Sequence, residues 1–219
     1  MSTASLPTGR APRTEWTLLL LSAASGAADA FAFICVGQVF AGVMTGNLVL
    51  LGVSAVGLGE QGVALRVITA LFWYAFGVAC GTWLTARLRL PLPRTLLCEA
   101  ALLTAGAALW GLGLITSGGD RLGLLMLVSA AMGIQGRVLT TPTNYFTGTL
   151  TSLVGRAASR SWGPEDGWVA GRLAAVVAGA AVTALAVRFR PELAAVVAAA
   201  PVAGALWIET PPGRRRTAD

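Results

Sequence analysis

The segment FAGVMTGNLVLLG, residues 40–52, is apolar at both ends but has the polar step Thr45-Gly46-Asn47 at its centre. Glycine weakens a helix, and neighbouring polar side chains can bond to the backbone groups that are freed. A similar segment, NYFTGTLTSLVG, occupies residues 144–155. Within a bilayer, interrupted helices are tolerated only where they are buried in protein or line a water-filled cavity. The two segments therefore predict interrupted helices at a polar site, with close helix packing through small residues as the alternative.

The composition indicates a membrane protein. The 219 residues are 55% hydrophobic and 12% charged, whereas a soluble domain is about 45–50% apolar and about 25% charged. Apolar runs long enough, or nearly long enough, to cross a bilayer cover residues 16–36, 67–86, 95–116, 122–138, 172–187 and 193–208. We therefore expect an all-α polytopic membrane protein whose main partner is the lipid bilayer. The net charge of +6 comes from arginines that lie between these runs, so no nucleic-acid partner is expected.

The residue types that are absent restrict the chemistry. The chain has no histidine, and all 16 basic residues are arginines, which excludes histidine metal sites, histidine bases and Schiff-base lysines. The three cysteines form no CxxC pair, and no nucleotide-binding or metalloprotease motif is present. We therefore expect a protein that is not an enzyme, with no catalytic residues, no metal site and no cofactor.

The chain also contains an internal repeat. LSAASGAADAFAF at residue 21 resembles VSAAMGIQGRVL at residue 128, and MTGNLVLLG at residue 44 resembles FTGTLTSLVG at residue 146. Three further short matches follow in the same order, and it is this order that indicates duplication. We predict one transmembrane domain, residues 16–211, built from repeat one, 16–118, and repeat two, 119–211. A cytoplasmic N-terminal tail, 1–15, and a basic C-terminal tail, 212–219, flank it.

The arginines favour one of two topologies. If the first helix and the interrupted segment of each repeat make one net crossing, the chain crosses six times and the second repeat is inverted. Eleven arginines would then lie inside and four outside, whereas eight crossings would give ten and six. The positive-inside rule favours six crossings, with one interrupted helix per repeat and both termini cytoplasmic; eight crossings remain the alternative.

Ionisable residues inside apolar runs are candidates for function. Asp29 is thirteen residues beyond Trp16, and a carboxylate at that depth costs roughly 2.5–3.5 kcal/mol, so it is expected to face the protein interior. Arg137 lies one position from the repeat equivalent of Asp29, which makes it the expected partner, either in a structural ion pair or at an ion-coupled site. The remaining alternative is an interfacial Arg137 that never meets Asp29. Glu99 is expected at the membrane interface near Arg94. The candidate substrate or ion site comprises Asp29, Thr45, Gly46, Asn47, Gln135, Arg137, Asn144, Thr147, Gly148 and Thr149.

Residues 26–52 resemble the signature of the YoaK family, bacterial membrane proteins classed as domain of unknown function 1275. The resemblance rests on Gly26, Asp29, Ala30, Phe33, Gly37, Phe40 and the step Met44-Thr45-Gly46-Asn47. In the second half it rests on Met132, Gly133, Gln135, Thr147, Gly148, Thr149 and Leu150, while Gly136 replaces the usual asparagine. The resemblance implies a multi-pass protein of the bacterial inner membrane and supplies no activity.

Three functions are compatible with these features. The first is a small-solute transporter or permease, in which the interrupted helices of two inverted repeats enclose a central site. The alternatives are a non-transporting membrane module or partner subunit, and an intramembrane enzyme. The sequence does not identify the solute, and a homo-oligomer is compatible with a chain of this size.

Overall fold

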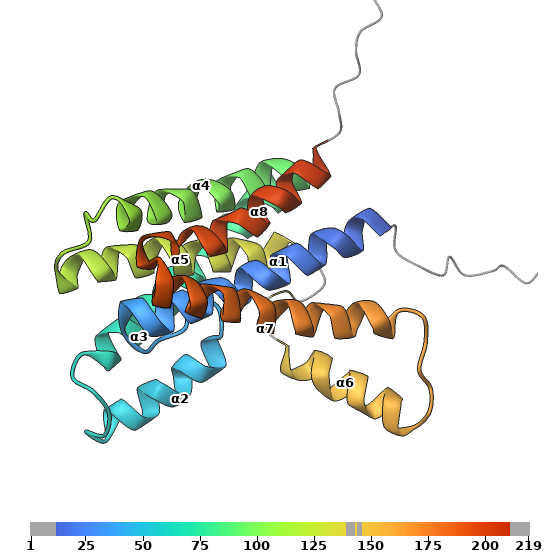
Figure 1. Ribbon diagram of the computed structural model, residues 1–219, viewed down its shortest axis with the longest axis horizontal. Helices are drawn as coiled ribbons and strands as arrows, with labels where there is room; N and C mark the ends of the chain where they lie inside the picture. The colour runs from blue at the N-terminus through green and yellow to red at the C-terminus, as the bar shows by residue number, and fades with distance from the viewer. Residues whose placement is uncertain (1–11, 139–142, 144–145, 211–219) are drawn as a thin grey trace, which may run out of the picture.

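All regular secondary structure is helical in the part of the chain that the protein's computed structural model describes, residues 12–138, 143 and 146–210. Eight α-helices follow one another (Figure 1): α1 (Pro12–Phe31), α2 (Met44–Ala55), α3 (Val63–Thr82), α4 (Leu92–Gly111), α5 (Gly118–Val138), α6 (Thr147–Ala158), α7 (Asp166–Phe189) and α8 (Val196–Glu209). Short π-helical segments extend α1 over Ala32–Gly37 and α3 over Trp83–Arg87, and a 3-10 turn, Pro191–Leu193, precedes α8.

The helices fall into two length classes. Five helical segments are long and apolar enough to cross a membrane: Arg13–Gly37, Val63–Arg87, Leu92–Gly111, Asp166–Phe189 and Pro191–Glu209. The 21 residues of α5 make it as long as these. In contrast, α2 and α6 have 12 residues each, or about 18 Å of helix, which reaches only part of the way across a core about 30 Å thick. The expected all-helical architecture is therefore confirmed for the described residues, and five of the helical segments are long and apolar enough to cross a membrane.

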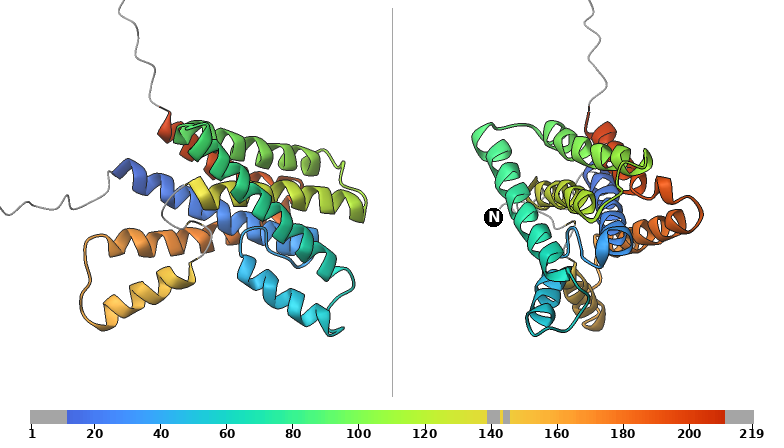
Figure 2. Two further views of the ribbon diagram at one scale, coloured as in Figure 1. Left: turned by 180° about the vertical axis from the view of Figure 1, so that it is seen from behind. Right: turned by 90° about the vertical axis from the view of Figure 1, so that its left-hand side faces the viewer.

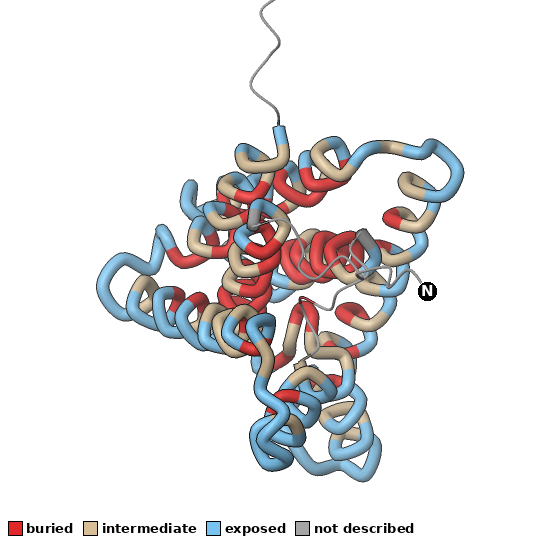
Figure 3. The backbone as a smooth tube through the Cα atoms, turned by 90° about the vertical axis from the view of Figure 1, so that its right-hand side faces the viewer, coloured by how far each residue is buried: buried red, intermediate tan, exposed pale blue. Residues whose placement is uncertain are grey.

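The core lies where α1 and α5 meet the helices around them. In Figure 3 the buried stretches gather on the central helices, and the outer turns are exposed. α1 packs against α7 and α8, while α5 packs against α3 and α4; α4 and α8 also pack together. The largest fully buried apolar side chains come mainly from the two central helices and include Leu18, Leu21, Phe31, Leu124, Leu125 and Met132.

Glycines allow the two main helix pairs to approach closely. A Cβ atom added at Gly26 of α1 would overlap the carbonyl oxygen of Val176 on α7, and one at Gly179 of α7 would overlap that of Ala23 on α1. The pair of α3 and α5 has the same arrangement, because a Cβ atom at Gly77 or Gly133 would overlap a carbonyl oxygen of the facing helix. Small residues that let backbones touch are typical of helix packing in membranes.

The short helices α2 and α6 stand apart from the bundle. In Figure 1 both begin near the centre of the molecule and run outward in opposite directions, and the end-on view in Figure 2 shows both on the same side of the bundle. The first residues of α1 and the last residues of α8 lie at the same end of the molecule (Figure 1). This arrangement places the first turns of α2 and α6, which carry the Thr-Gly steps, close to the middle of the protein.

Candidate functional site

Asp29 is the carboxylate at the centre of the candidate site. It lies on α1, eight residues before the end of the π-helical extension, and is 8% exposed. Its Oδ1 accepts hydrogen bonds from the backbone N–H of Gly42, at 2.7 Å, and of Val43, at 3.4 Å. Both of these bonds go to Oδ1, and no described residue donates a hydrogen bond to Oδ2. Asp29 therefore holds the start of α2 with one oxygen and has the other available.

The backbone between α1 and α2 turns sharply to reach Asp29. The π-helical segment ends at Gly37. Gly37 and the next residue, Gln38, both have positive φ angles, of 136° and 59°. Residues 38–43 then return towards the centre of the protein, and α2 begins at Met44. The Asn47 side chain accepts from the N–H of Phe40 at 2.9 Å and donates to its C=O at 2.7 Å. This two-way clamp satisfies backbone groups that the interrupted helix leaves free.

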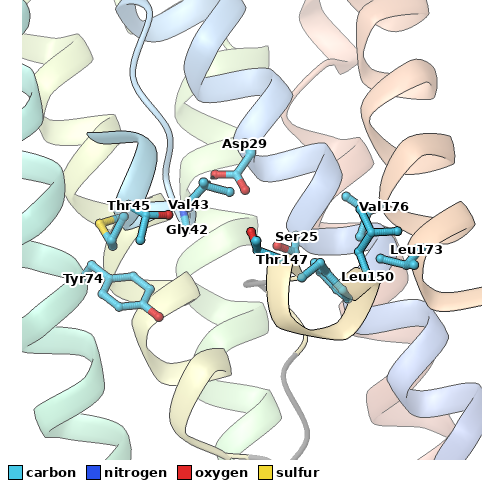
Figure 4. Close-up of a pocket in the computed structure, with 12 residues that line it drawn as sticks. Ser25, Asp29, Gly42, Val43, Thr45, Tyr74, Thr147, Leu150, Leu173 and Val176 are labelled. Atoms are coloured by element: carbon cyan, nitrogen blue, oxygen red, sulfur yellow. Dashed lines mark hydrogen bonds between the residues drawn. The ribbon is translucent and has the colours of Figure 1, made fainter. Parts of the chain in front are cut away.

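A cavity of about 600 Å³ opens beside Asp29. Its walls come from both halves of the chain, since the first turn of α2 contributes Met44 and Thr45 and the first turn of α6 contributes Phe146 and Thr147. Figure 4 shows that Asp29, Thr147 and the hydroxyl of Tyr74 lie around the same space. The two predicted interrupted segments and the predicted deep carboxylate thus meet at a single cavity.

Two polar residues of this cavity were not predicted from the sequence. Ser25 lies on α1 one turn before Asp29, and Tyr74 lies on the middle of α3. The spacing of Ser25 and Asp29, four residues on one helix, is a signal that they share a face. Tyr74 stands in the aromatic run LFWYAF, where nothing distinguishes it from residues that face lipid. The remaining lining is apolar and includes Leu150, Leu173 and Val176.

The helix ends give the cavity a nearly balanced charge. Neither α2 nor α6 has a side-chain cap at its first turn, and each helix N-terminus carries a partial charge of about +0.5. Asp29 supplies one negative charge when it is ionised, and no other Asp, Glu or Arg side chain is among the lining residues. The site therefore offers hydrogen-bond donors at the helix ends and an acceptor at Asp29, with little net charge.

The other predicted site residues that the structure describes lie outside the cavity lining. Asn47 is fully buried in its clamp with Phe40. Gln135 of α5 donates from Nε2 to the Leu21 carbonyl at 3.0 Å and to Thr143 Oγ1 at 2.9 Å, so it links α5 to α1 and to the segment before α6. Gly46, Gly148 and Thr149 lie in the first turns of α2 and α6 but do not line the cavity. Asn144 lies outside the described residues.

The expected ion pair between Asp29 and Arg137 is wrong. The Nε of Arg137 donates to the Thr82 hydroxyl at 3.1 Å, and the arginine is exposed near the end of α5. Asp29 instead bonds to backbone N–H groups before α2. The physical reason is that α1 packs on α7 and α5 packs on α3, which directs the ends of the two central helices to different partners.

Glu99, which was expected at the membrane interface, is buried within the helix bundle. Because α4 begins at Leu92, directly after Pro91, Glu99 stands two turns inside the helix. It is fully buried, and both of its carboxylate oxygens lack a hydrogen-bond partner. Within the described part of the chain, no group of three or more Cys, Asp or Glu side chains is placed to hold a metal ion.

Comparison with known proteins places the chain in a family without an assigned activity. The model of the family described as "Protein of unknown function (DUF1275)" matches residues 17–208. No curated protein and no solved structure matches the chain significantly. The matched region spans all eight helices except the first turns of α1 and the last residue of α8. The chain is a helical membrane protein that belongs to the DUF1275 family.

Proposed function

We propose that the protein is a permease for a small solute and that the cavity beside Asp29 is its binding site. The observation that carries the proposal is the meeting of two short helices, one from each half of the chain, at a cavity that holds a buried carboxylate. Transporters built from repeats bind substrates where such discontinuous helices end near the middle of the membrane. We propose transport rather than catalysis.

The order and packing of the helices support two inverted repeats as part of this proposal. α1–α4 and α5–α8 each run long, short, long, long. The first long helix of each half packs on the third helix of the other half, as α1 on α7 and α5 on α3. Gly26 and Gly133 lie on the first helix of their halves, and each faces a carbonyl oxygen of the third helix of the other half. Gly77 and Gly179 lie on the third helices, and each faces a carbonyl oxygen of the first helix of the other half. Two units related by a pseudo-two-fold axis would produce this exchange of partners.

The positions of the chain ends support six net crossings of the bacterial inner membrane. The first residues of α1 and the last of α8 lie at one end of the bundle (Figure 1), as an even number of crossings requires. The turn between α3 and α4, which carries Arg87, Arg89 and Arg94, would lie on the same side as both termini. Under the positive-inside rule that side is the cytoplasm.

The lining of the cavity favours a particular class of solute. Most of the wall is apolar, with polar groups from Ser25, Asp29, Thr45, Tyr74 and Thr147. Asp29 Oδ2 would accept a hydrogen bond from a donor on the solute, and the uncapped ends of α2 and α6 would donate to an acceptor. We propose a small solute that is neutral or zwitterionic overall and carries both a donor and an acceptor on a largely apolar frame.

The two short helices are the elements that we propose move during transport. α2 buries only Asn47, and α6 buries only Leu153, so little packing holds either helix against the bundle. Polar contacts hold them instead. For α2 these are the hydrogen bonds from the N–H groups of Gly42 and Val43 to Asp29 of α1, and for α6 an ion pair in which Arg156 Nη2 lies 2.6 Å from Asp166 Oδ1 of α7. Rocking of these helices against the long ones would open the cavity to either side in turn.

A ligand screen on the purified protein tests this proposal. The midpoint of thermal unfolding is measured in detergent with amino acids, amides, nucleobases, sugars and carboxylates, for the wild type, Asp29→Asn and Asp120→Asn. Asp120 is the matched control, because its carboxylate lies at the start of α5 outside the cavity. A ligand at a hundredfold excess over its Kd stabilises the folded state by about 2.7 kcal/mol.

The expected result is a class of ligand that stabilises the wild type and Asp120→Asn but not Asp29→Asn, followed by uptake of that ligand into proteoliposomes. Stabilisation that persists in Asp29→Asn would show that the ligand does not depend on the cavity beside Asp29, and would contradict the proposed binding site. A protein that responds to no solute class and co-purifies with a stoichiometric partner would favour the partner-subunit function instead.

A further inference from the structure

A second cavity, of about 360 Å³, lies between the first turns of α3 and α5. Val36 at the end of the π-helical segment closes one side, Gly62 and Leu65 belong to the start of α3, and Thr116 and Ser117 precede α5. It shares no lining residue with the cavity beside Asp29. The two cavities are therefore separate sites, and nothing in the proposed transport function uses the second one.

Two arginines from different helices line this second cavity. Arg66 is the fourth residue of α3, and Arg121 is the fourth residue of α5. Neither forms an ion pair with a described residue, and no acidic side chain lines the cavity. Two positive charges that share a cavity without a counter-ion repel each other, and a bound anion removes that repulsion.

The helix starts add to the positive potential. α3 begins after Gly62 without a side-chain cap, so its first N–H groups have no side-chain acceptor. α5 is capped by Ser117, whose Oγ accepts from the N–H of Asp120, and Asp120 in turn accepts from the N–H groups of Thr116 and Ser117. The other acid nearby, Glu60, accepts from the Gln38 side chain at 2.6 Å. Both acids are thus engaged in local bonds, and the uncapped start of α3 remains as a site that favours anions.

The Arg66 guanidinium is held in place, but its hydrogen-bond donors are only partly paired. One N–H of the group, from Nη2, donates to the carbonyl of Gln61 at 3.2 Å. Its Nε is buried and has no hydrogen-bond partner, which costs free energy. Gly37 makes room for the group, since a Cβ atom there would lie 2.7 Å from Nε and from Nη1. The chain therefore positions the planar Arg66 guanidinium at a cavity that a second arginine, Arg121, also lines.

We propose that this cavity binds a phosphate group through Arg66, Arg121 and the first turn of α3. Guanidinium forks match the oxygens of a phosphate in a bidentate manner, and helix N-termini bind the same group through their N–H donors. The cavity lies at the first turns of two long helices, and in the proposed six-crossing topology these turns would lie at the membrane surface, where lipid headgroups are. The phosphate can therefore belong to a phospholipid or to a soluble phosphate compound.

Two binding measurements on the full chain test the proposal. Equilibrium dialysis with radiolabelled inorganic phosphate measures binding of the free ion in a non-ionic detergent. Native mass spectrometry measures retention of phosphatidylglycerol against a glycosyl diacylglycerol, which has the same tails but no phosphate. Both are run on the wild type, Arg66→Gln, Arg121→Gln and Arg87→Gln. Arg87 is the matched control, because it is an exposed arginine on the far end of the same helical segment as Arg66.

The expected result is about one phosphate group bound per chain, with affinity at least tenfold weaker in both Arg66→Gln and Arg121→Gln and unchanged in Arg87→Gln. Because Arg121 is exposed, its variant should fold normally, which circular dichroism checks. Binding of the phospholipid alone would identify a lipid headgroup site, and binding of inorganic phosphate would identify a soluble ligand. Equal binding by the wild type and both cavity variants, or no binding in either measurement, would overturn the proposal.

Discussion

Replacing Gly26 with alanine is expected to force α1 and α7 apart. The added Cβ would overlap the carbonyl oxygen of Val176 and lie 2.8 Å from its carbonyl carbon, whereas ordinary contacts begin at 3.4 Å. The atoms that the added Cβ would meet are backbone atoms in the middle of a 24-residue helix. No flexible side chain can therefore move away to relieve the overlap. Overpacking of this kind costs about 1–3 kcal/mol, and we expect a loss of stability in that range.

The matched control for this change is Gly52→Ala. Gly52 lies on α2, and no atom stands within 4 Å of the position that a Cβ would occupy. Both substitutions gain the same helix propensity, up to about 1 kcal/mol, so the difference between the two variants isolates the contact of α1 with α7. The free energy of unfolding is measured in mixed micelles by titration with sodium dodecyl sulfate, with tryptophan fluorescence as the signal.

The reasoning would be refuted if Gly26→Ala and Gly52→Ala had the same stability. Gly179→Ala tests the same contact from the opposite helix, since its Cβ would meet the backbone of Ala23 on α1. The double variant Gly26→Ala, Gly179→Ala should lose less than the sum of the two single losses, because helices already separated by one alanine accommodate the other.

Three further predictions follow from individual polar groups. Asn47→Ala should lower stability by about 1–3 kcal/mol, because it leaves the Phe40 N–H and C=O without their partners; Thr151→Ala, which removes an exposed hydroxyl, is its control in the same unfolding titration. Glu99→Met should leave stability unchanged or raise it by about 1–4 kcal/mol, because the carboxylate is buried without hydrogen-bond partners; a clear loss would mean that Glu99 has a partner within the fold. Cysteines at Thr45 and Thr147, in a chain without native cysteines, should be joined by a short bifunctional maleimide, because both line one cavity; no cross-linked product would contradict the meeting of α2 and α6.

The sequence allowed the centre of the site to be predicted because its signals are local. A polar Thr-Gly step inside an apolar run predicts an interrupted helix without knowledge of any other segment, and a carboxylate far inside a run must face the protein. Thr45, Thr147 and Asp29 accordingly line the same cavity. The length of the interrupted helices also agrees with the expectation that each makes no full crossing, since both have 12 residues.

Partners between distant segments could not be predicted in the same way. Whether Asp29 meets Arg137 depends on the register and the neighbours of two helices about a hundred residues apart, and a repeat alignment does not provide these. Asp29 is satisfied by the backbone of its own returning segment, a contact that residue types do not reveal. Glu99 lies further inside its helix than expected for a simpler reason, because α4 starts three residues earlier than the apolar run predicts.

The most direct test of the transport proposal asks whether the cavity opens to water on both sides of the membrane. Thr45→Cys is placed in a chain whose native cysteines, Cys35, Cys80 and Cys98, are replaced by alanine. A charged, membrane-impermeant thiol reagent is then applied to right-side-out and to inside-out vesicles, with Gly52→Cys on the outer part of α2 as the control for access from one side only. We predict that Thr45→Cys reacts in both kinds of vesicle, at rates that a bound solute changes. Reaction in neither kind of vesicle, while Gly52→Cys still reacts, would show that the converging helices form a packed interface and would contradict the account.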